Sequence, residues 1–297
     1  MKKILIFGIG LIGGSIALKI KEEQLFDEVI GMGRKGGRVL EPFVISGMLN
    51  SIADDIEKTI ESVDLIIIAT PVAQTKKILK AIYPSLKKNT LLTDVGSTKS
   101  NIMNDAKEIL KEKYIQFIGS HPIAGSEKHG PDASDYKLFE NKDIILTPHD
   151  KSPISSIDYL KEFWISLGGR VSIMTPTNHD EIFSTVSHLP HLLAFGLVNL
   201  INNKSNKSEL LNFAASGFRD FSRIAASSPE VWRDISLANK KAILNDLKLY
   251  KDEISSIIKL IDEDDVTMLD KYLLQASTTR SKCCLLYTSD AADDALS

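Results

Sequence analysis

The chain has 297 residues, which is enough for two domains that each bury a core. A hydrophobic content of 43%, a charged content of 25% and a net charge of -3 are typical of a globular protein, and they give no reason to expect nucleic acid or a membrane as a partner. The only cysteines, Cys283 and Cys284, form neither a disulfide framework nor a zinc-binding spacing, so we expect no metal.

The apolar start of the chain does not have the features of a targeting segment. Glycines interrupt it directly after Phe7, and no small-residue cleavage site follows. No apolar run approaches the roughly 18 to 20 residues that span a bilayer. We therefore expect a cytoplasmic protein.

Strand-like and helix-like segments alternate through the first half of the chain. Short apolar runs predict strands at 3–7, 28–32, 64–69, 90–95, 115–118, 143–147 and 168–174. Helical patterns lie between several of them, at 12–22, 100–112 and 154–167. This alternation predicts an α/β fold, with a doubly wound, mainly parallel sheet covered by helices on both faces, in a first domain of residues 1–175.

The second half has no clear strand pattern. Helical patterns cover 180–202, 210–226, 231–261 and 264–276, so we expect an all-α domain of residues 176–282. The final segment resembles the translation of a sequencing-library adapter. We therefore expect residues 283–297 to be a non-native, disordered tail, the alternative being a genuine polar tail.

A glycine loop follows the first strand and precedes the first helix. Gly8, Gly10 and Gly13 fit the pattern Gly-x-Gly-x-x-Gly, in which the glycines allow a tight turn, the approach of a pyrophosphate and the packing of the helix. The helix start, with Leu11 and Ile12, offers N–H groups to phosphates. The sequence therefore predicts a Rossmann-type dinucleotide site, the alternative being an ordinary glycine turn.

The second strand suggests which dinucleotide is bound. An NAD site usually has an acidic residue there for the ribose hydroxyl, but this strand is followed by Arg34, Lys35 and Arg38. These cations favour the 2′-phosphate of NADP over NAD, the alternative being a solvated basic loop. Thr70 and Pro71, which follow the strand at 64–69, complete the predicted cofactor site.

A histidine lies at the end of a later strand. His121 belongs to the segment Gly-Ser-His-Pro-Ile-Ala-Gly, directly after the apolar run at 115–118. Ligands of open α/β sheets bind at the carboxyl ends of strands, and histidine exchanges a proton near neutral pH. His121 is therefore a candidate acid or base, the alternative being a histidine satisfied by the backbone. Ser97 follows the preceding strand.

The helical half contributes two further polar segments. His188 and His191 are three residues apart, a spacing that can bind metal, but no third ligand is apparent and Pro190 should kink the helix between them. Arg219 and Arg223 are four apart on a predicted helix and suit a substrate with two carboxylates. The alternative is a surface pair of arginines.

Together with the glycine loop, these segments resemble the prephenate/arogenate dehydrogenase family of tyrosine biosynthesis, from about residue 2 to 280. The resemblance implies an oxidative decarboxylation, in which C4 of a cyclohexadienol loses a hydride to the nicotinamide, its hydroxyl loses a proton and CO2 leaves. It implies that His121 accepts that proton and that Ser97 orients His121 and the substrate. It also implies a homodimer formed through the helical domain.

The resemblance assigns the remaining site residues to the substrate. His191 matches a substrate-binding histidine, and Arg223 matches an arginine that holds a carboxylate. Arg219 and Asp220 occupy the positions of a charged pair at the rim, although the family often has lysine at the first of them. Glu127 matches an acid near the mouth of the site.

Prephenate and arogenate remain alternative small-molecule substrates at this point. Another two-domain NAD(P)-dependent enzyme, such as a β-hydroxyacid dehydrogenase, is a second possibility, although those enzymes rely on a lysine borne by a helix. A non-catalytic NADP-sensing regulator is a third, but it would not need His121, Ser97 and Arg223 together.

Overall fold

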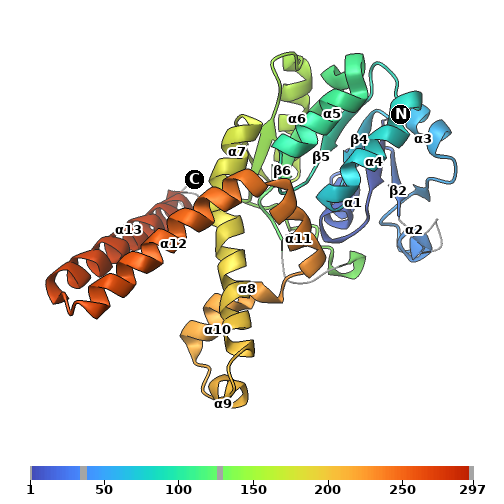
Figure 1. Ribbon diagram of the computed structural model, residues 1–297. Coiled ribbons are helices and arrows are strands. Elements are labelled where there is room, and N and C mark those ends of the chain that lie inside the picture. Colours follow the sequence, from blue (N-terminus) through green and yellow to red (C-terminus); the bar gives the residue numbers. More distant parts are fainter. Residues whose placement is uncertain (1, 34–38, 126–129, 294–297) are drawn as a thin grey trace. The chain divides into compact units, whose positions relative to one another are not determined.

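The computed structural model describes residues 2–33, 39–125 and 130–293. The chain forms two compact units, Met1–Ile243 and Leu244–Ser297. The first unit contains the sheet, the helices that cover it and most of the helical half, and the second contains a pair of long helices (Figure 1).

One eight-stranded sheet organises the first unit, in the order β3-β2-β1-β4-β5-β6-β7-β8. All neighbouring strands are parallel except β6 and β7. The doubly wound, mainly parallel sheet predicted from the sequence is therefore confirmed. The strands are β1 (Lys3–Phe7), β2 (Glu28–Met32), β3 (Ser51–Ile52), β4 (Leu65–Ile68), β5 (Leu91–Asp94), β6 (Phe117–Pro122), β7 (Asp143–Thr147) and β8 (Arg170–Ile173).

Alternate residues of the strands pack into two separate hydrophobic cores, one on each face of the sheet. In β1, Ile4 and Ile6 pack in one core with α1 and α6, whereas Leu5 and Phe7 pack in the other with α3, α4 and α5. Strands buried on both faces read as continuous apolar runs, which is why these segments were predictable. The helices of this domain are α1 (Leu11–Glu22), α2 (Glu41–Ile45), α3 (Ile56–Ser62), α4 (Val72–Ile82), α5 (Ser100–Leu110) and α6 (Ile154–Ser166).

The antiparallel pair β6–β7 brings a later segment to the glycine loop. The described part of the connection between these strands contains no long helix, which a parallel return would need. Instead, the segment around the short helix η4 (Pro131–Ala133) lies against the start of α1, where the Asp135 backbone N–H donates to the Ser15 hydroxyl at 2.9 Å. The region after His121 thus leads directly to the predicted cofactor site.

No strand follows β8 in the described part of the chain, which confirms the all-α second half. The helix predicted at 210–226 is broken, because the chain is extended at Ala215. The helix predicted at 231–261 is broken at Asn239. The elements are α7 (Pro176–Phe183), a π-helical turn η5 (Ser184–His188), α8 (Leu189–Asn202), α9 (Lys207–Asn212), α10 (Ser216–Ser222), a 3-10 turn η6 (Arg223–Ala226), α11 (Pro229–Ala238), α12 (Lys240–Asp262) and α13 (Val266–Asp293).

The segment Pro176–Asn202 forms one continuous helical rod that runs through Pro190, and the predicted kink at this proline stays a prediction. The π-helical turn η5 ends at His188, two residues before Pro190. Its altered hydrogen-bond spacing allows the helix to continue although proline has no N–H group to donate. By length and composition alone this rod could cross a membrane, which corrects the expectation that no apolar segment is long enough. However, its His179, Asp180 and His188 are buried and hydrogen-bonded within the protein.

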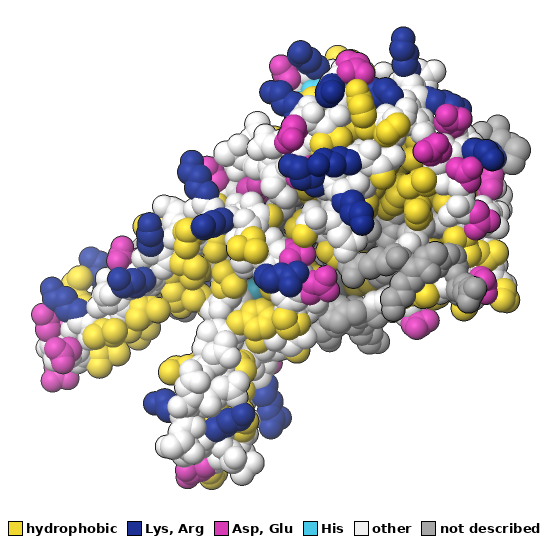
Figure 2. Space-filling view, turned by 45° about the vertical axis from the view of Figure 1, so that its right-hand side comes forward, with side chains coloured by type: hydrophobic (Ala, Val, Ile, Leu, Met, Phe, Trp, Pro, Cys, Tyr) yellow, Lys and Arg dark blue, Asp and Glu magenta, His cyan; other side chains and the backbone are white. Residues whose placement is uncertain are grey.

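The second unit is a helical hairpin of α12 and α13, joined by a hydrogen bond of 3.0 Å from the Tyr272 hydroxyl to Glu253. Hydrophobic side chains lie exposed along this hairpin (Figure 2), including Ile258 and Ile261, which are 61% and 59% exposed. The backbone of α13 continues as a helix to Asp293. The predicted tail from residue 283 is thus helical over most of its length, and its non-native origin stays a prediction.

Candidate active site

The glycine loop lies at the carboxyl edge of the sheet, beside the end of β4. Gly8 has a φ of 91°, and a Cβ on it would lie 2.6 Å from the Ala69 carbonyl oxygen. A Cβ on Gly13 would lie 2.0 Å from the Gly8 carbonyl oxygen. A larger residue at either position would therefore distort the turn or push α1 away from the sheet.

Gly10 has a different environment, because a Cβ there would meet no atom of the described residues within 4 Å, apart from those of its chain neighbours. It is the N-cap of α1, and no side chain of the described residues caps this helix. The N–H groups of Leu11 and Ile12 therefore begin the helix without an intrahelical partner. The open space beside the second glycine and the uncapped helix start suit a dinucleotide pyrophosphate.

Thr70 and Pro71 border this loop from the end of β4. The Thr70 methyl carbon would lie 2.8 Å from a Cβ on Gly8, so the two residues are neighbours. The Thr70 hydroxyl is buried without a hydrogen-bond partner among the described residues. Native proteins rarely bury such a group unpaired, so it too suits a bound polar ligand.

His121 lies near the end of β6, at the same edge of the sheet as the glycine loop. Its Nδ1 is 2.8 Å from the Nε2 of His179, and its ring meets the Phe183 ring edge-on with centroids 5.0 Å apart. Burial holds the pKa of His121 well below its usual range, and nearby positive charge on His179, Lys99 and His188 would lower it further. The ring is therefore neutral at pH 7 and able to accept a proton.

Ser97 lies at the same edge, in the loop between β5 and α5, but the described residues show no hydrogen bond between Ser97 and His121. The backbone of Ser97 bonds to His188 instead. The partner of the His121 ring is His179, which the sequence analysis did not single out. The only sequence signal for His179 was its place beside an aspartate at the start of the same rod as His188.

His188 belongs to a buried polar network. Its side chain is 1% exposed, and its Nδ1 lies 3.2 Å from the amide nitrogen of Asn239, which also donates to the Asp180 carbonyl at 2.7 Å. Burial lowers the pKa of His188 to about 4. No group of three side chains able to hold a metal occurs in the described residues.

His191 lies on α8 and stacks on Trp232 of α11, with ring centroids 3.8 Å apart and planes at 19°. Its Nδ1 donates to the Ser187 carbonyl at 2.9 Å. Burial lowers the pKa of His191, and the positive charge of Arg223 adds to this. The structure thus brings His191 and Arg223 together. Trp232 joins them, although the sequence pattern around it gave no reason to select it.

Arg219 and Asp220 are both exposed on α10, whereas Arg223 is the first residue of the turn η6 that packs against α8. The two arginines therefore do not share one regular α-helix, which differs from the expectation. Two predicted site residues, Arg34 and Glu127, lie outside the described residues, as does the rest of the basic segment 34–38.

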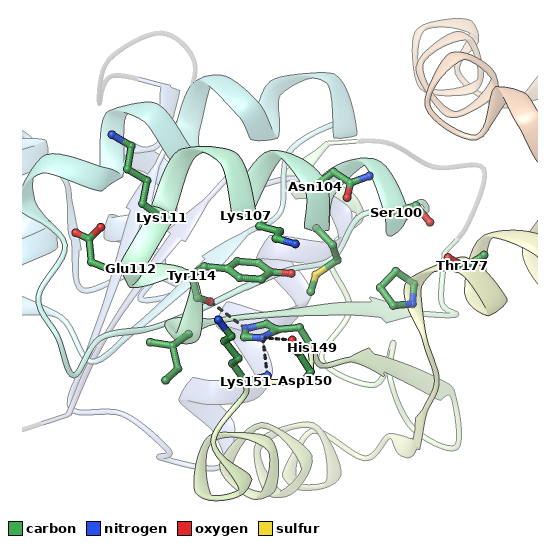
Figure 3. A pocket seen from close by; sticks show the side chains of 13 residues that line it. Ser100, Asn104, Lys107, Lys111, Glu112, Tyr114, His149, Asp150, Lys151 and Thr177 are labelled. Carbon is green, nitrogen blue, oxygen red and sulfur yellow. Dashed lines mark hydrogen bonds and ion pairs between the residues drawn. The ribbon is translucent and has the colours of Figure 1, made fainter.

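A separate cavity of about 680 Å³ opens beside α5 (Figure 3). Lys107 points toward it, and the Tyr114 ring stacks on His149 with centroids 4.0 Å apart. Among the described residues that line it, none is a predicted site residue. This cavity is therefore distinct from the edge of the sheet that carries His121.

The sheet edge combines an open glycine loop with a neutral, half-buried histidine, and the helical half adds a histidine and an arginine. This combination defines a two-domain, nucleotide-dependent dehydrogenase. Two family models match the chain: the nucleotide-binding domain of prephenate dehydrogenase over residues 16–173, and the dimerization domain of prephenate dehydrogenase over residues 175–275. The chain belongs to the prephenate dehydrogenase family.

Relatives and solved structures agree with this assignment. The chain is 38% identical to prephenate dehydrogenase of Bacillus subtilis, over 93% of this chain and 75% of that protein. It is 31% identical to cyclohexadienyl dehydrogenase of Zymomonas mobilis, over 94% and 95%. The structure of Aquifex aeolicus prephenate dehydrogenase with hydroxyphenyl propionate and NAD+ matches with a TM-score of 0.88 and 33% identity, over 95% and 98%. Synechocystis arogenate dehydrogenase matches with a TM-score of 0.81 and 28% identity, over 94% and 99%.

Proposed function

We propose that this protein oxidatively decarboxylates prephenate to 4-hydroxyphenylpyruvate in tyrosine biosynthesis, with a nicotinamide dinucleotide as oxidant. The ring carboxylate leaves as CO2, the C4 hydroxyl becomes a carbonyl before aromatisation, and the hydroxyl proton must be accepted. When bound, the cofactor supplies the hydride acceptor. The observation that carries this proposal is the neutral His121 at the sheet edge of the glycine loop, in a chain whose halves match both domains of the family.

His121 acts as the acceptor of the C4 hydroxyl proton. An imidazole that accepts a proton must be uncharged beforehand, and the lowered pKa of His121 favours its uncharged form near neutral pH. A positioned base of this kind contributes a factor of about 10² to 10⁴ to the rate. Ser97, at the same edge, is the second predicted catalytic residue, and its proposed role is to orient the substrate beside His121.

The helical half holds the anionic substrate. Arg223 binds one carboxylate of prephenate, because a guanidinium forms two parallel hydrogen bonds with such a group. His191 is fixed by its stack on Trp232 and by its bond to the backbone, so its remaining ring nitrogen is presented in one orientation. Arg219 and Asp220 are the proposed charged pair at the rim of the site, and Glu127, which lies outside the described residues, is the acid that the resemblance implies near its mouth.

The cofactor of this protein is NADP in preference to NAD. The support is the basic segment of Arg34, Lys35 and Arg38 after β2, where an NAD site usually has an acid. The structure of the Aquifex aeolicus relative contains NAD+, so the preference of this protein for NADP needs its own test. The ratio of kcat/KM with NADP to kcat/KM with NAD measures this preference, and a ratio in favour of NAD contradicts the proposal.

The protein works as a cytoplasmic homodimer formed through its helical half. Val186 and Leu200 are 64% and 57% exposed in the first unit, and the α12–α13 hairpin exposes further apolar side chains. Apolar surface of this extent marks a protein interface. Because the rod Pro176–Asn202 buries Asp180 and His188 in hydrogen bonds, its apolar side chains are assigned to that interface rather than to lipid. A monomer in light scattering at micromolar concentration contradicts the dimer.

The decisive experiment follows nicotinamide reduction by the purified protein with prephenate or arogenate, each with NAD or NADP. The His121→Asn variant should bind nucleotide normally and lose about 10²-fold or more in kcat. The Arg223→Ala variant should mainly raise KM. Turnover of arogenate alone reassigns the substrate. Turnover of neither, with nucleotide binding intact, refutes the proposed function and favours a nucleotide-sensing regulator.

A further inference from the structure

Three side chains form a buried line that begins at His121. The His121 Nδ1 lies 2.8 Å from the Nε2 of His179, and the His179 Nδ1 lies 2.9 Å from Oδ1 of Asp180. The His179 side chain is fully buried, and Asp180 is 4% exposed. The Phe183 ring packs against both imidazoles, at 5.0 Å from His121 and 4.6 Å from His179. The two rings are thus held in one arrangement.

Asp180 is anchored on the sheet domain. Its two carboxylate oxygens accept the backbone N–H groups of Lys99 at 2.7 Å and of Ser100 at 2.8 Å, at the start of α5. Burial acts to raise the pKa of Asp180, but the hydrogen bonds from His179, Lys99 and Ser100 outweigh it and hold the pKa below its usual range. The positive end of the α5 dipole favours the same charge. Asp180 is therefore an anion that can only accept hydrogen bonds.

The charge of Asp180 determines the proton positions along this line. A carboxylate requires a proton on the Nδ1 of His179, and burial keeps His179 neutral, so its Nε2 carries a lone pair. That lone pair must accept a hydrogen bond, so the proton of neutral His121 lies on Nδ1. The Nε2 of His121 is then left unprotonated, which is the state that a proton acceptor requires.

We infer that His179, held by Asp180, is a positioning residue that fixes the tautomer and orientation of His121 for proton acceptance. This inference rests on the proposed function of His121 as the base. The arrangement is chemically equivalent to a carboxylate that orients a catalytic histidine through its Nδ1–H, with a second imidazole interposed. It assigns to His179 the orienting role that the family resemblance implies for Ser97.

A purely structural role makes a different prediction. Asp180 docks α7 on α5 through backbone N–H groups, and that contact does not need the His179 ring. If docking were the whole role, removal of the imidazole would change stability without changing the chemistry of His121. The ring of His179 can therefore be tested separately from the carboxylate of Asp180.

The kinetic test compares His179→Leu with His179→Gln. Leucine fills the space but cannot accept a hydrogen bond, whereas the glutamine amide oxygen can accept one from the His121 Nδ1–H. We expect His179→Leu to lower kcat by about 10-fold to 100-fold with KM within about twofold, as when a group that orients a histidine is lost. Glutamine should restore most of this loss. Equal losses in both variants, or an unchanged kcat, overturn the inference.

The matched control is His149→Gln. His149 is a half-buried histidine with a ring partner and a bond to a backbone carbonyl, but it lines the separate cavity of Figure 3. The kcat of the His149→Gln variant should stay within about twofold of that of the unaltered protein. A comparable fall in kcat for His149→Gln would show that loss of any such ring slows turnover, which overturns the specific role of His179.

A spectroscopic measurement tests the same point without substrate. Long-range ¹H–¹⁵N spectra of the histidine rings report the tautomer, and His121 in the full-length protein should be protonated on Nδ1. In His179→Leu it should shift toward protonation on Nε2. A resting Nε2–H tautomer of His121 overturns the inference. If neither prephenate nor arogenate is turned over but His121 is the Nδ1–H tautomer, the proposed function fails while the positioning by His179 stands.

Discussion

Lys99 and Asp94 form an ion pair that is almost completely shielded from solvent, with side chains 0% and 1% exposed. Lys99 also donates to the Ser120 carbonyl at 2.8 Å, and Asp94 accepts the Gly96 backbone N–H at 2.7 Å. The pair thus ties β5, β6 and the loop that carries Ser97 into one rigid edge, next to His121.

Removal of Lys99 should destabilise the protein strongly. Lys99→Met leaves Asp94 buried without its counter-charge, and such a loss costs about 3–5 kcal/mol in free energy of unfolding. Urea denaturation measures it. Lys107→Met on the exposed face of α5 is the control and should change the free energy by about 0.5 kcal/mol or less. A loss below about 1 kcal/mol for Lys99→Met contradicts the importance of the pair.

The glycines of the loop should respond differently to alanine. Gly10→Ala adds a methyl group where no protein atom lies within 4 Å, so the thermal midpoint should stay unchanged while the dissociation constant of the nucleotide rises about 10-fold or more. Gly13→Ala places a Cβ 2.0 Å from the Gly8 carbonyl oxygen, so it should lower the midpoint as well. Calorimetry and nucleotide titration separate the two effects. Equal nucleotide affinity in Gly10→Ala and the unaltered protein contradicts the assignment of the pyrophosphate to this loop.

Trp232 should act on substrate binding. A stacked aromatic pair contributes about 0.5–1.5 kcal/mol beyond its buried area, so loss of the ring in Trp232→Leu should raise the KM for the substrate about 3-fold to 10-fold. Trp232→Phe keeps a ring against His191 and should lie closer to the unaltered protein. Steady-state kinetics at saturating nucleotide measure the change. A normal KM with a reduced kcat would instead place Trp232 in the chemical step.

Stability should fall as the pH drops below neutral. The pKa of His188 is about 4 in the folded protein and about 6.5 in the unfolded chain, so between these values only the unfolded chain takes up the proton. The contribution of His188 to the free energy of unfolding is complete above pH 6.5 and is lost progressively toward pH 4. The loss between pH 7 and pH 5 is about 2 kcal/mol. The lowered pKa values of His121, His179 and His191 act in the same direction. Urea denaturation across this range measures the slope, which His188→Gln should reduce, and an unaltered slope in that variant would exclude His188 as a source.

The parts of the fold that sequence predicted well are those with a strong local pattern. Strands such as Leu65–Ile68 are buried on both faces and read as unbroken apolar runs, and the glycine loop has a fixed spacing. The strand Ser51–Ile52 has only two residues and no pattern of its own. Its existence depends on the neighbouring strand β2, which is a non-local contact that local reading cannot detect.

The same limit applies to the site. His121 was identifiable because a motif surrounds it, whereas its partner His179 is 58 residues further along the chain and becomes its neighbour only through packing. Trp232 is likewise joined to α8, and Asn239 to the turn η5, by tertiary contacts. Conversely, whether Ser97 orients His121, as the resemblance implies, depends on side-chain geometry that a sequence does not specify.

The π-helical turn before Pro190 determines in which direction the later side chains of the rod Pro176–Asn202 point around its axis. Nine residues separate His179 from His188, and at about 100° per residue a regular α-helix would place them on opposite sides of the rod. The turn absorbs about one residue, which leaves a rotation of about 80°. Both side chains can then enter the protein, and the Asn239 side chain bonds to the Asp180 carbonyl and the His188 ring at once. A one-residue deletion within Ser184–Ser187 would therefore turn the π-helical turn into regular α-helix and keep His188 and His191 in register, whereas a one-residue insertion there would rotate both by about 100° away from the sheet edge.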